Sequence, residues 1–475
     1  MKNFIKNLHL RLSDLFLFVG FVPFALFLIF GQLFMQYPNP NDVAFKLWMI
    51  IPSFIILVAS WSVYIYLEYK RGNIVKNYIN WIFIVLAVIG LIGIFIQPSL
   101  FVENVVVRRV TEDSVLQIGD VVTVSLTISG IHYAFFAMDI LAVLLFIYIG
   151  LFIFPKRFTS LDFIKYLGYA IFVLLAALLL YSLIFEHANI GPFIKILLGK
   201  GEEGSDISVY AFKSFIIHRN AYGMVLMIGI IFCFINHLLD KKWWYYLLMG
   251  LFYINMIFTY CKTSLLISAL LIAIYVIYQL IITYKDFPKR NRNIFIAIGV
   301  ILILAIGVIG ISLLTKGKFL GFIYLFIKSY TGSTTLDMRS YIWDNCYQLL
   351  RANPAYLFFG RGFGLINLML LPMNTVNGDA VFPTHSAYVN LLAEGGILYL
   401  LAYLLLLGYA VYVAIKTYKN APKMTVAVSL GTLAFILYST TETIHYLVYI
   451  FFFVLFTLNE VSKEKVTSEE ATESL

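Results

Sequence analysis

Hydrophobic residues lie in separate runs along most of the chain, and short polar or basic stretches divide these runs. A helix of roughly twenty residues crosses about 30 Å of hydrocarbon, which matches the length of the runs. The pattern predicts an all-α, polytopic integral membrane helix bundle of about twelve transmembrane helices. The predicted spans are 14–35, 46–67, 78–97, 133–154, 165–185, 220–239, 243–260, 263–284, 293–314, 386–415, 424–441 and 444–459.

The short basic loops predict how this bundle is oriented. Lys and Arg in short loops favour the cytoplasmic side. An even number of spans puts both termini on one side, and the basic clusters fall on that side too. These clusters lie at 70–76, 156–165, 241–242, 285–292 and 416–423. We therefore expect a multi-pass protein of the cell (plasma) membrane with both termini in the cytoplasm, including the polar tail 460–475.

The long connections then lie outside the cell. The largest, 315–385, joins the ninth and tenth predicted spans and keeps aromatic residues that anchor at membrane interfaces. We expect short interfacial helices there rather than disorder. The connection 98–132 is rich in β-branched residues and predicts a small hairpin. No internal repeat is visible. We expect residues 1–475 to form a single transmembrane domain.

Composition supports the membrane interpretation and excludes other classes. Hydrophobic residues make up 61% of the chain and charged residues 12%, with a mean hydropathy of +0.90. An ordinary soluble domain has roughly twice that charged share. The net charge of +9 comes from Lys and Arg scattered between spans, so no nucleic-acid partner is expected. Cys233, Cys261 and Cys346 predict neither a disulfide framework nor a zinc site.

Charged residues outside the cytoplasmic clusters are candidates for function, because charge at membrane depth costs free energy. Arg219 lies at the outer mouth of a predicted span, and Lys262 lies between two spans with hardly any loop around it. Arg339 and Arg361 lie in the long outer loop. Several cations at one outer mouth suit a phosphate or diphosphate. The alternative for a lone lysine such as Lys262 is that it extends to the lipid headgroups.

His385 begins the predicted span after that loop. An imidazole near neutral pH can accept a proton from a sugar hydroxyl, although a histidine here can also simply be solvated by headgroups. Glu394 lies about 13 Å deeper on the opposite side of the helix, so it is expected to pair with another helix instead. Glu442 and His445 are three residues apart, and a structural pairing is expected for them.

The run Gly360-Arg361-Gly362-Phe363-Gly364 is glycine-rich but lacks the lysine and the strand of a nucleotide-binding loop. It predicts a tight turn that presents Arg361.

Between residues 215 and 415 the chain resembles the O-antigen ligase and O-antigen polymerase family of polytopic membrane glycosyltransferases. The matching segments are Arg339-Ser340-Tyr341-Ile342-Trp343, Asn353-Pro354, the glycine run, His385-Ser386-Ala387-Tyr388 with Leu391 to Gly396, and, more weakly, Arg219-Asn220-Ala221-Tyr222-Gly223 and Lys262-Thr263-Ser264. Two residues depart from the family. Ser386 replaces a more frequent Asn, and Lys262 replaces an Arg, which keeps the charge but loses the bidentate fork.

The resemblance implies a glycosyltransferase that moves a glycan from a polyprenyl diphosphate to an acceptor hydroxyl on the outer face, without a cofactor or a metal. It implies that His385 is the catalytic base, and that Arg219, Lys262, Arg339 and Arg361 bind the diphosphate. The expected partners are the polyprenyl-diphosphate-linked oligosaccharide, membrane lipids and other polysaccharide assembly proteins.

Several functions remain open at this point. We favour a polymerase that joins repeat units, and the close alternative is a ligase that transfers the glycan to another surface acceptor. A transporter or flippase for lipid-linked sugars would also need many spans and a cationic cavity, although its usual internal repeats are not visible. A non-catalytic polysaccharide-binding protein is the third alternative, and it requires His385 to be dispensable.

Overall fold

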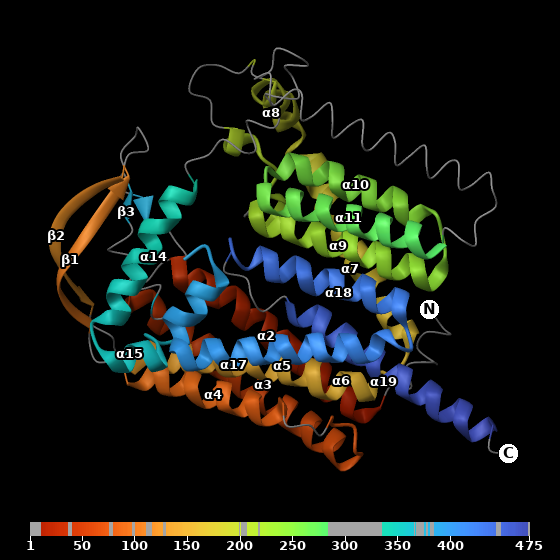
Figure 1. Ribbon diagram of the computed structural model, residues 1–475. Coiled ribbons are helices and arrows are strands. Elements are labelled where there is room, and N and C mark those ends of the chain that lie inside the picture. The colour runs from red at the N-terminus through yellow and green to blue at the C-terminus, as the bar shows by residue number, and fades with distance from the viewer. Residues whose placement is uncertain are drawn as a thin grey trace. The chain divides into compact units, whose positions relative to one another are not determined.

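The computed structural model describes residues 11–473 except 37–39, 76–78, 97–99, 111–115, 127–129, 199, 201–206, 217–218, 284–334, 365, 367–374, 377–378, 381–383 and 443–447. The chain divides into two compact units, which are described separately (Figure 1). Unit 1 comprises Met1–Ser160, Thr335–Thr425 and Ser439–Leu475, and unit 2 comprises Leu161–Thr334 and Val426–Tyr438. The expectation of a single domain stays a prediction.

Unit 1 is a bundle of long apolar helices. Helix α2 packs against α3, α4 packs against α5 and α17, and α17 packs against α19. Figure 1 shows α14 and α15 at one end of this bundle, next to the β-strands. The helices are α2 (Leu12–Gln36), α3 (Pro40–Lys70), α4 (Ile79–Phe95), α5 (Gly130–Tyr148), α6 (Phe154–Arg157), α14 (Thr335–Arg351), α15 (Pro354–Phe359), α17 (Ala387–Tyr418) and α19 (Val448–Glu473).

The predicted hairpin between the third and fourth spans is present. Strands β1 (Leu100–Val110) and β2 (Leu116–Leu126) pair antiparallel, with Leu100 opposite Leu126. A second, very short pair is formed by β3 (Thr375–Val376) and β4 (Asp379–Ala380). These strands are the exception to an otherwise helical architecture among the described residues.

One span of unit 1 is continuous but irregular. A π-helical turn, η1 (Ile149–Ile153), joins α5 to α6, and Pro155 lies in the first turn of α6. Proline has no amide hydrogen to donate to the preceding turn, and a π-turn is a common way to absorb such a disruption. The residues Tyr133–Arg157 therefore still form one apolar segment long enough to cross a membrane.

Unit 2 is built around α9. This helix packs against α7, α10 and α11 and is buried along most of its length. Gly229 explains one close approach, because a Cβ atom there would lie 2.2 Å from Cδ1 of Leu175 on α7. The helices of this unit are α7 (Leu161–Phe185), α8 (Ile190–Leu197), α9 (Arg219–Asp240), α10 (Trp244–Thr259), α11 (Lys262–Thr283) and residues 426–438 of α18 (Pro422–Tyr438).

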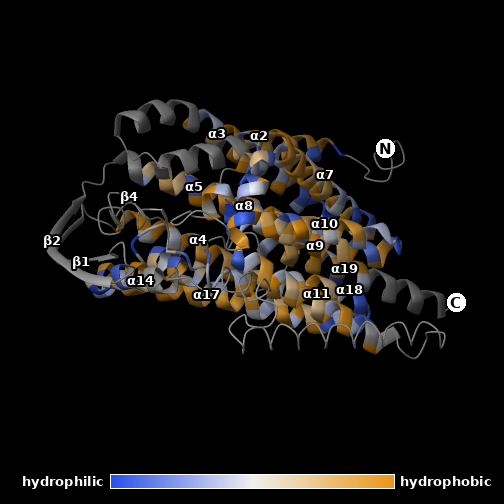
Figure 2. Cartoon of the chain, turned by 90° about the horizontal axis from the view of Figure 1, so that it is seen from above, coloured by the Kyte–Doolittle hydropathy of each residue, from blue (hydrophilic) through white to orange (hydrophobic). Residues whose placement is uncertain are grey.

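Described helices occupy every predicted span except 293–314, which lies outside the described residues. Within the described part, six helices are long and apolar enough to cross a membrane. Large apolar side chains such as Leu247 and Ile281 are exposed, and Figure 2 shows hydrophobic residues along these helices. The protein is therefore a multi-pass helical membrane protein. The count of about twelve spans and the cytoplasmic termini stay predictions.

The C-terminal residues continue the last helix, α19. Helix α19 begins at Val448 and continues to Glu473, so it includes most of the tail 460–475. Near the start of that tail, the Lys463 ammonium forms an ion pair with the Glu460 carboxylate one turn earlier.

Candidate functional site

The start of α17 places His385. Ser386 caps the helix, and its hydroxyl accepts a hydrogen bond from the amide of Val389 at 3.4 Å. The amide of Ala387 donates to the carbonyl of Ser439 at 2.8 Å, which ties α17 to the segment after α18. His385 itself has φ +47°, in the left-handed region that costs a residue with a side chain about 1–3 kcal/mol. The surrounding contacts must hold it there.

Trp343 of α14 supplies one of those contacts. Its indole Nε1 donates to the carbonyl of Thr384 at 2.6 Å, directly before His385. The Thr384 hydroxyl donates to the Ser386 carbonyl at 3.0 Å and lies 3.3 Å from Oδ1 of Asn390. The histidine backbone is therefore fixed from both sides. Contacts within unit 1 therefore stabilise the left-handed conformation of His385.

The His385 ring faces the Glu442 carboxylate. Nδ1 of His385 lies 3.7 Å from Oε2 of Glu442, within ion-pair range but beyond hydrogen-bond length. The Glu442 side chain is 6% exposed and the His385 side chain 22% exposed. Glu442 was expected to pair with His445, which lies outside the described residues. Sequence reasoning thus identified the carboxylate but missed that it faces His385.

Glu394 holds the glycine run against α17. This helix is broken at Gly396, where φ is +70°, and the break frees carbonyls of the preceding turn. The amides of Arg361 and Gly362 donate to the carbonyls of Ala393 and Glu394 at 2.7 and 2.9 Å. The Gly364 amide donates to Oε1 of Glu394 at 3.2 Å. Among the described residues, the buried carboxylate is therefore contacted by a loop amide and by the Asn390 side chain, and it forms no ion pair.

The glycine run is a tight turn, as predicted, but the arginine within it is not presented to solvent. Arg361 is 2% exposed, and its guanidinium carbon lies 3.8 Å from the ring centroid of Tyr356. Burial lowers the pKa of the Arg361 guanidinium below its ordinary value. Gly360 permits the docking, because a Cβ there would lie 2.3 Å from the Glu394 backbone. A role of Arg361 in binding diphosphate stays a prediction.

Arg219 and Lys262 come together in unit 2. Arg219 begins α9, Lys262 begins α11, and both lie over the ring of Tyr260. The Arg219 guanidinium carbon is 5.6 Å and the Lys262 ammonium 5.1 Å from that ring centroid. Tyr260 ends α10 in the left-handed conformation, with φ +52°, so α11 begins almost at once. This tight reversal explains why the sequence shows hardly any loop around Lys262.

Close helix packing fixes this pair of cations. A Cβ on Gly223 would lie 2.6 Å from Cβ of Cys261, so α9 approaches the α10–α11 turn as only glycine allows. The Tyr438 hydroxyl donates to the Asn220 carbonyl at 3.0 Å, next to Arg219. The first residues of both α9 and α11 are thereby held in one place.

The cation pair has a positive electrostatic environment. Helix N-termini carry partial positive charge and free amide donors, which suit anions. Among the described residues, no carboxylate forms an ion pair with Arg219 or Lys262, and one terminal nitrogen of Arg219 is buried without a hydrogen-bond partner. We call Arg219, Tyr260 and Lys262 the cation cluster. Its chemistry suits a negatively charged ligand.

The remaining predicted site residue, Arg339, lies on α14, and its side chain is outside the described part of the chain. The structure thus brings two of the four predicted cations into one cluster. Arg361 lies elsewhere. Its loop forms hydrogen bonds with the carbonyls of Ala393 and Glu394, about two turns along α17 from His385.

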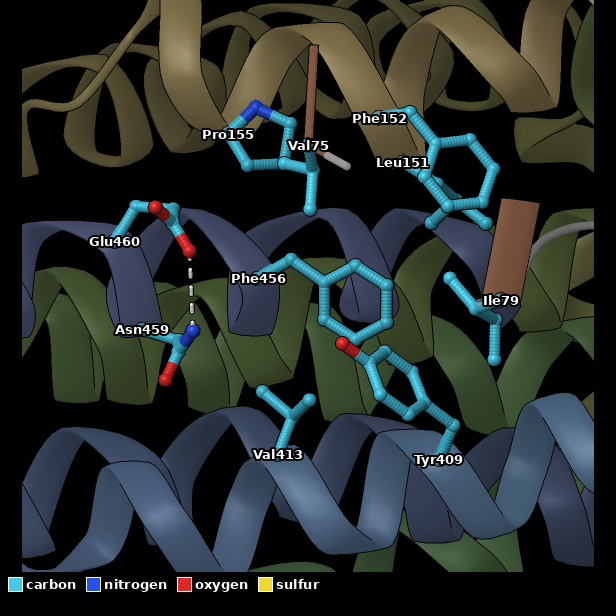
Figure 3. A pocket seen from close by; sticks show the side chains of 10 residues that line it. All are labelled: Val75, Ile79, Leu151, Phe152, Pro155, Tyr409, Val413, Phe456, Asn459 and Glu460. Atoms are coloured by element: carbon cyan, nitrogen blue, oxygen red, sulfur yellow. Dashed lines mark hydrogen bonds between the residues drawn. The ribbon is translucent and has the colours of Figure 1, made fainter. Parts of the chain in front are cut away.

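Figure 3 shows a small cavity elsewhere in unit 1, lined on α17 by Tyr409 and Val413. Its walls include Phe152, Pro155, Tyr409, Val413 and Phe456. Its volume of about 20 Å³ has room for about one water molecule. This cavity is too small for a sugar or a diphosphate.

Within the described residues, no group of three or more His, Cys, Asp and Glu side chains could hold a metal ion. A metal-independent reaction stays a prediction.

Comparisons of the chain with protein-family models, with curated proteins and with solved structures found no match. The resemblance to the O-antigen ligase and polymerase family therefore depends on the motifs of the sequence, and it stays a prediction.

Proposed function

We propose that the protein is a membrane glycosyltransferase that joins polyprenyl-diphosphate-linked glycan repeat units on the outer face of the cell membrane. The observation that carries this proposal is the cation cluster of unit 2. Arg219 and Lys262 begin two different helices, lie over one tyrosine ring, and form no ion pair with a described carboxylate. Two neighbouring, partly buried cations are costly unless an anion neutralises them. A diphosphate has the charge to do so.

The cation cluster and the other predicted site residues suit the chemistry of the transfer. The acceptor hydroxyl oxygen attacks the anomeric carbon, and the bond from that carbon to the diphosphate oxygen breaks. Negative charge then grows on the departing polyprenyl diphosphate, where Arg219 and Lys262 stabilise it. His385 takes the proton of the attacking hydroxyl. Arg339 and Arg361 are further candidates for binding the donor, and of these Arg361 is buried in unit 1.

A lipid-linked sugar transporter is the second candidate, and one observation favours it. Helix α17 is broken at Gly396, beside the buried carboxylate of Glu394. Transporters often bind their substrates at such discontinuous helices. A transporter would move the lipid-linked oligosaccharide across the bilayer and leave every glycosidic bond intact.

Reconstitution tests these functions together. The purified protein is placed in proteoliposomes with a fluorescent polyprenyl-diphosphate oligosaccharide, and the products are separated by length on a gel. A ladder of products supports the polymerase. A single larger product that forms only when a separate acceptor lipid is added supports the ligase. Unchanged donor that becomes accessible to an impermeant lectin supports the transporter, and it overturns the transferase.

A further inference from the structure

Glu442 is a buried charged residue that the proposed reaction leaves without a role. Its side chain is 6% exposed, and its Oε2 lies 3.7 Å from Nδ1 of His385. A carboxylate removed from water is costly unless charged or polar groups compensate it. The fold brings this carboxylate to the histidine from a distant segment of the chain, so local sequence does not explain their proximity.

A backbone contact sets the position of this carboxylate. The Ala387 amide donates to the Ser439 carbonyl at 2.8 Å, which joins the first turn of α17 to the segment that leads to Glu442. On the other side, Trp343 holds the carbonyl of Thr384 at 2.6 Å. His385 therefore lies in a left-handed conformation between two fixed neighbours. Both the ring and the carboxylate are attached to the same anchored backbone.

The two ring nitrogens of His385 have different surroundings. Nδ1 is buried and has no hydrogen-bond partner among the described residues, with Glu442 facing it at ion-pair distance. The 22% of the side chain that stays exposed belongs to atoms other than Nδ1. A proton on Nδ1 leaves the lone pair on Nε2, and a carboxylate next to Nδ1 stabilises that tautomer. The same carboxylate stabilises the imidazolium that forms when Nε2 accepts a proton.

We propose that Glu442 is a positioning residue for His385, and that the two form a dyad in which Nε2 accepts the proton of the acceptor hydroxyl. This inference rests on the proposed glycosyl transfer. Proton transfer from the hydroxyl to Nε2 leaves a positively charged ring. The negative charge of the Glu442 carboxylate stabilises this imidazolium without taking its proton. The dyad requires the distance of 3.7 Å to shorten to hydrogen-bond length when substrate binds, as is common for catalytic contacts.

The first test measures kinetics in proteoliposomes with the fluorescent polyprenyl-diphosphate oligosaccharide. Glu442→Gln keeps the shape but removes the charge, and we expect kcat to fall about 100-fold while KM for the donor changes less than about twofold. Glu442→Asp keeps the carboxylate and should recover about tenfold of the lost kcat. The matched control is Glu460→Gln, a half-buried carboxylate on α19 that should leave kcat unchanged.

Wild-type kcat in Glu442→Gln would overturn the dyad. An equal fall of kcat in the Gln and Asp variants would also overturn it, and so would a fall of kcat together with a rise of KM. A merely structural role of Glu442 gives these results.

The second test does not depend on transfer. The protein is labelled with ¹⁵N-histidine in nanodiscs, and the His385 signals are assigned from their loss in His385→Gln. We expect the proton on Nδ1 in the wild-type protein and a shift of that proton toward Nε2 in Glu442→Leu. An unchanged tautomer in Glu442→Leu overturns the dyad even if the protein transfers glycans. A tautomer that depends on Glu442 in a protein without transferase activity supports the pairing and refutes the proposed function instead.

Discussion

His385 in unit 1 and Lys262 in unit 2 occupy similar places in the chain but have opposite surroundings. Each lies at the start of a long apolar helix, next to or within a stretch of left-handed backbone. His385 faces a buried carboxylate, whereas Lys262 lies beside a second cation. A histidine opposite a carboxylate suits proton transfer, and two adjacent cations suit an anion. The same helix-start geometry therefore presents two different kinds of chemistry, one in each unit.

Ion pairs elsewhere in each unit contrast with the cation cluster. In unit 1, Arg157 forms an ion pair with Asp14 at 2.6 Å. In unit 2, Asp240 pairs with Lys165 at 2.5 Å and accepts hydrogen bonds from Tyr169 and Tyr245. In each of these two places, groups of the same unit compensate the charge. The Arg219 and Lys262 pair, for which the described residues supply no carboxylate, is where a ligand is expected to do so.

The largest effect is expected from His385→Ala. Loss of a general base should lower glycan transfer about 1,000-fold, while membrane insertion and donor binding stay the same. Product length on a gel measures transfer, and retention of labelled donor by the purified protein measures binding. His187→Ala changes an exposed histidine and is the matched control. Full transfer by correctly inserted His385→Ala would show that His385 is not the base. The contrast between a proton acceptor in unit 1 and an anion site in unit 2 would then be wrong.

Asp14→Asn tests whether charges in unit 1 are paired for stability. The substitution leaves Arg157 buried without its counter-charge, and we expect the free energy of unfolding to fall by about 3 kcal/mol. Denaturant unfolding in detergent micelles measures the change. Asp162→Asn, at an exposed position in the first turn of α7, should stay within about 0.5 kcal/mol of the wild type. Equal stability of both variants would contradict the pairing argument.

For Lys262→Ala in unit 2, we expect no loss of stability, in contrast to Asp14→Asn. Removing one of two adjacent cations relieves repulsion, so stability should not fall. The donor KM should rise about 30-fold, because a charge-assisted contact to the diphosphate is lost. Lys262→Arg keeps the charge and should retain more activity than Lys262→Ala. Equal activity of the wild type and both variants would exclude Lys262 from donor binding.

Much of this architecture could be predicted because it depends on local physics. Run length and hydropathy indicated the helices, since each helix must satisfy its own backbone hydrogen bonds in hydrocarbon. The β-branched residues at 105–109 indicated the hairpin in the same local way.

The contacts made by the candidate site residues depend on tertiary structure and could not be predicted from local pattern. The expected pairing of Glu442 with His445 stays a prediction, because His445 lies outside the described residues, but its spacing of three residues gave no sign that Glu442 faces His385. The backbone hydrogen bond from the Ala387 amide to the Ser439 carbonyl brings Glu442 to His385. Arg361 is buried for a similar reason, because the break of α17 at Gly396 frees carbonyls that bind its loop.

The smallest expected effect concerns Tyr260, whose ring both cations contact. Each contact lies within the range of cation–π interactions, which contribute about 0.5–1 kcal/mol at exposed sites. Tyr260→Leu removes the ring, and we expect the donor KM to rise about fivefold because Arg219 and Lys262 lose their common support. Tyr260→Phe keeps the ring and should stay close to the wild-type KM. If the Phe variant loses as much affinity as the Leu variant, the hydroxyl positions the cluster and the ring does not. If neither variant changes KM, the two cations bind the donor independently of Tyr260, and the cluster is a coincidence of packing between α9 and the α10–α11 turn.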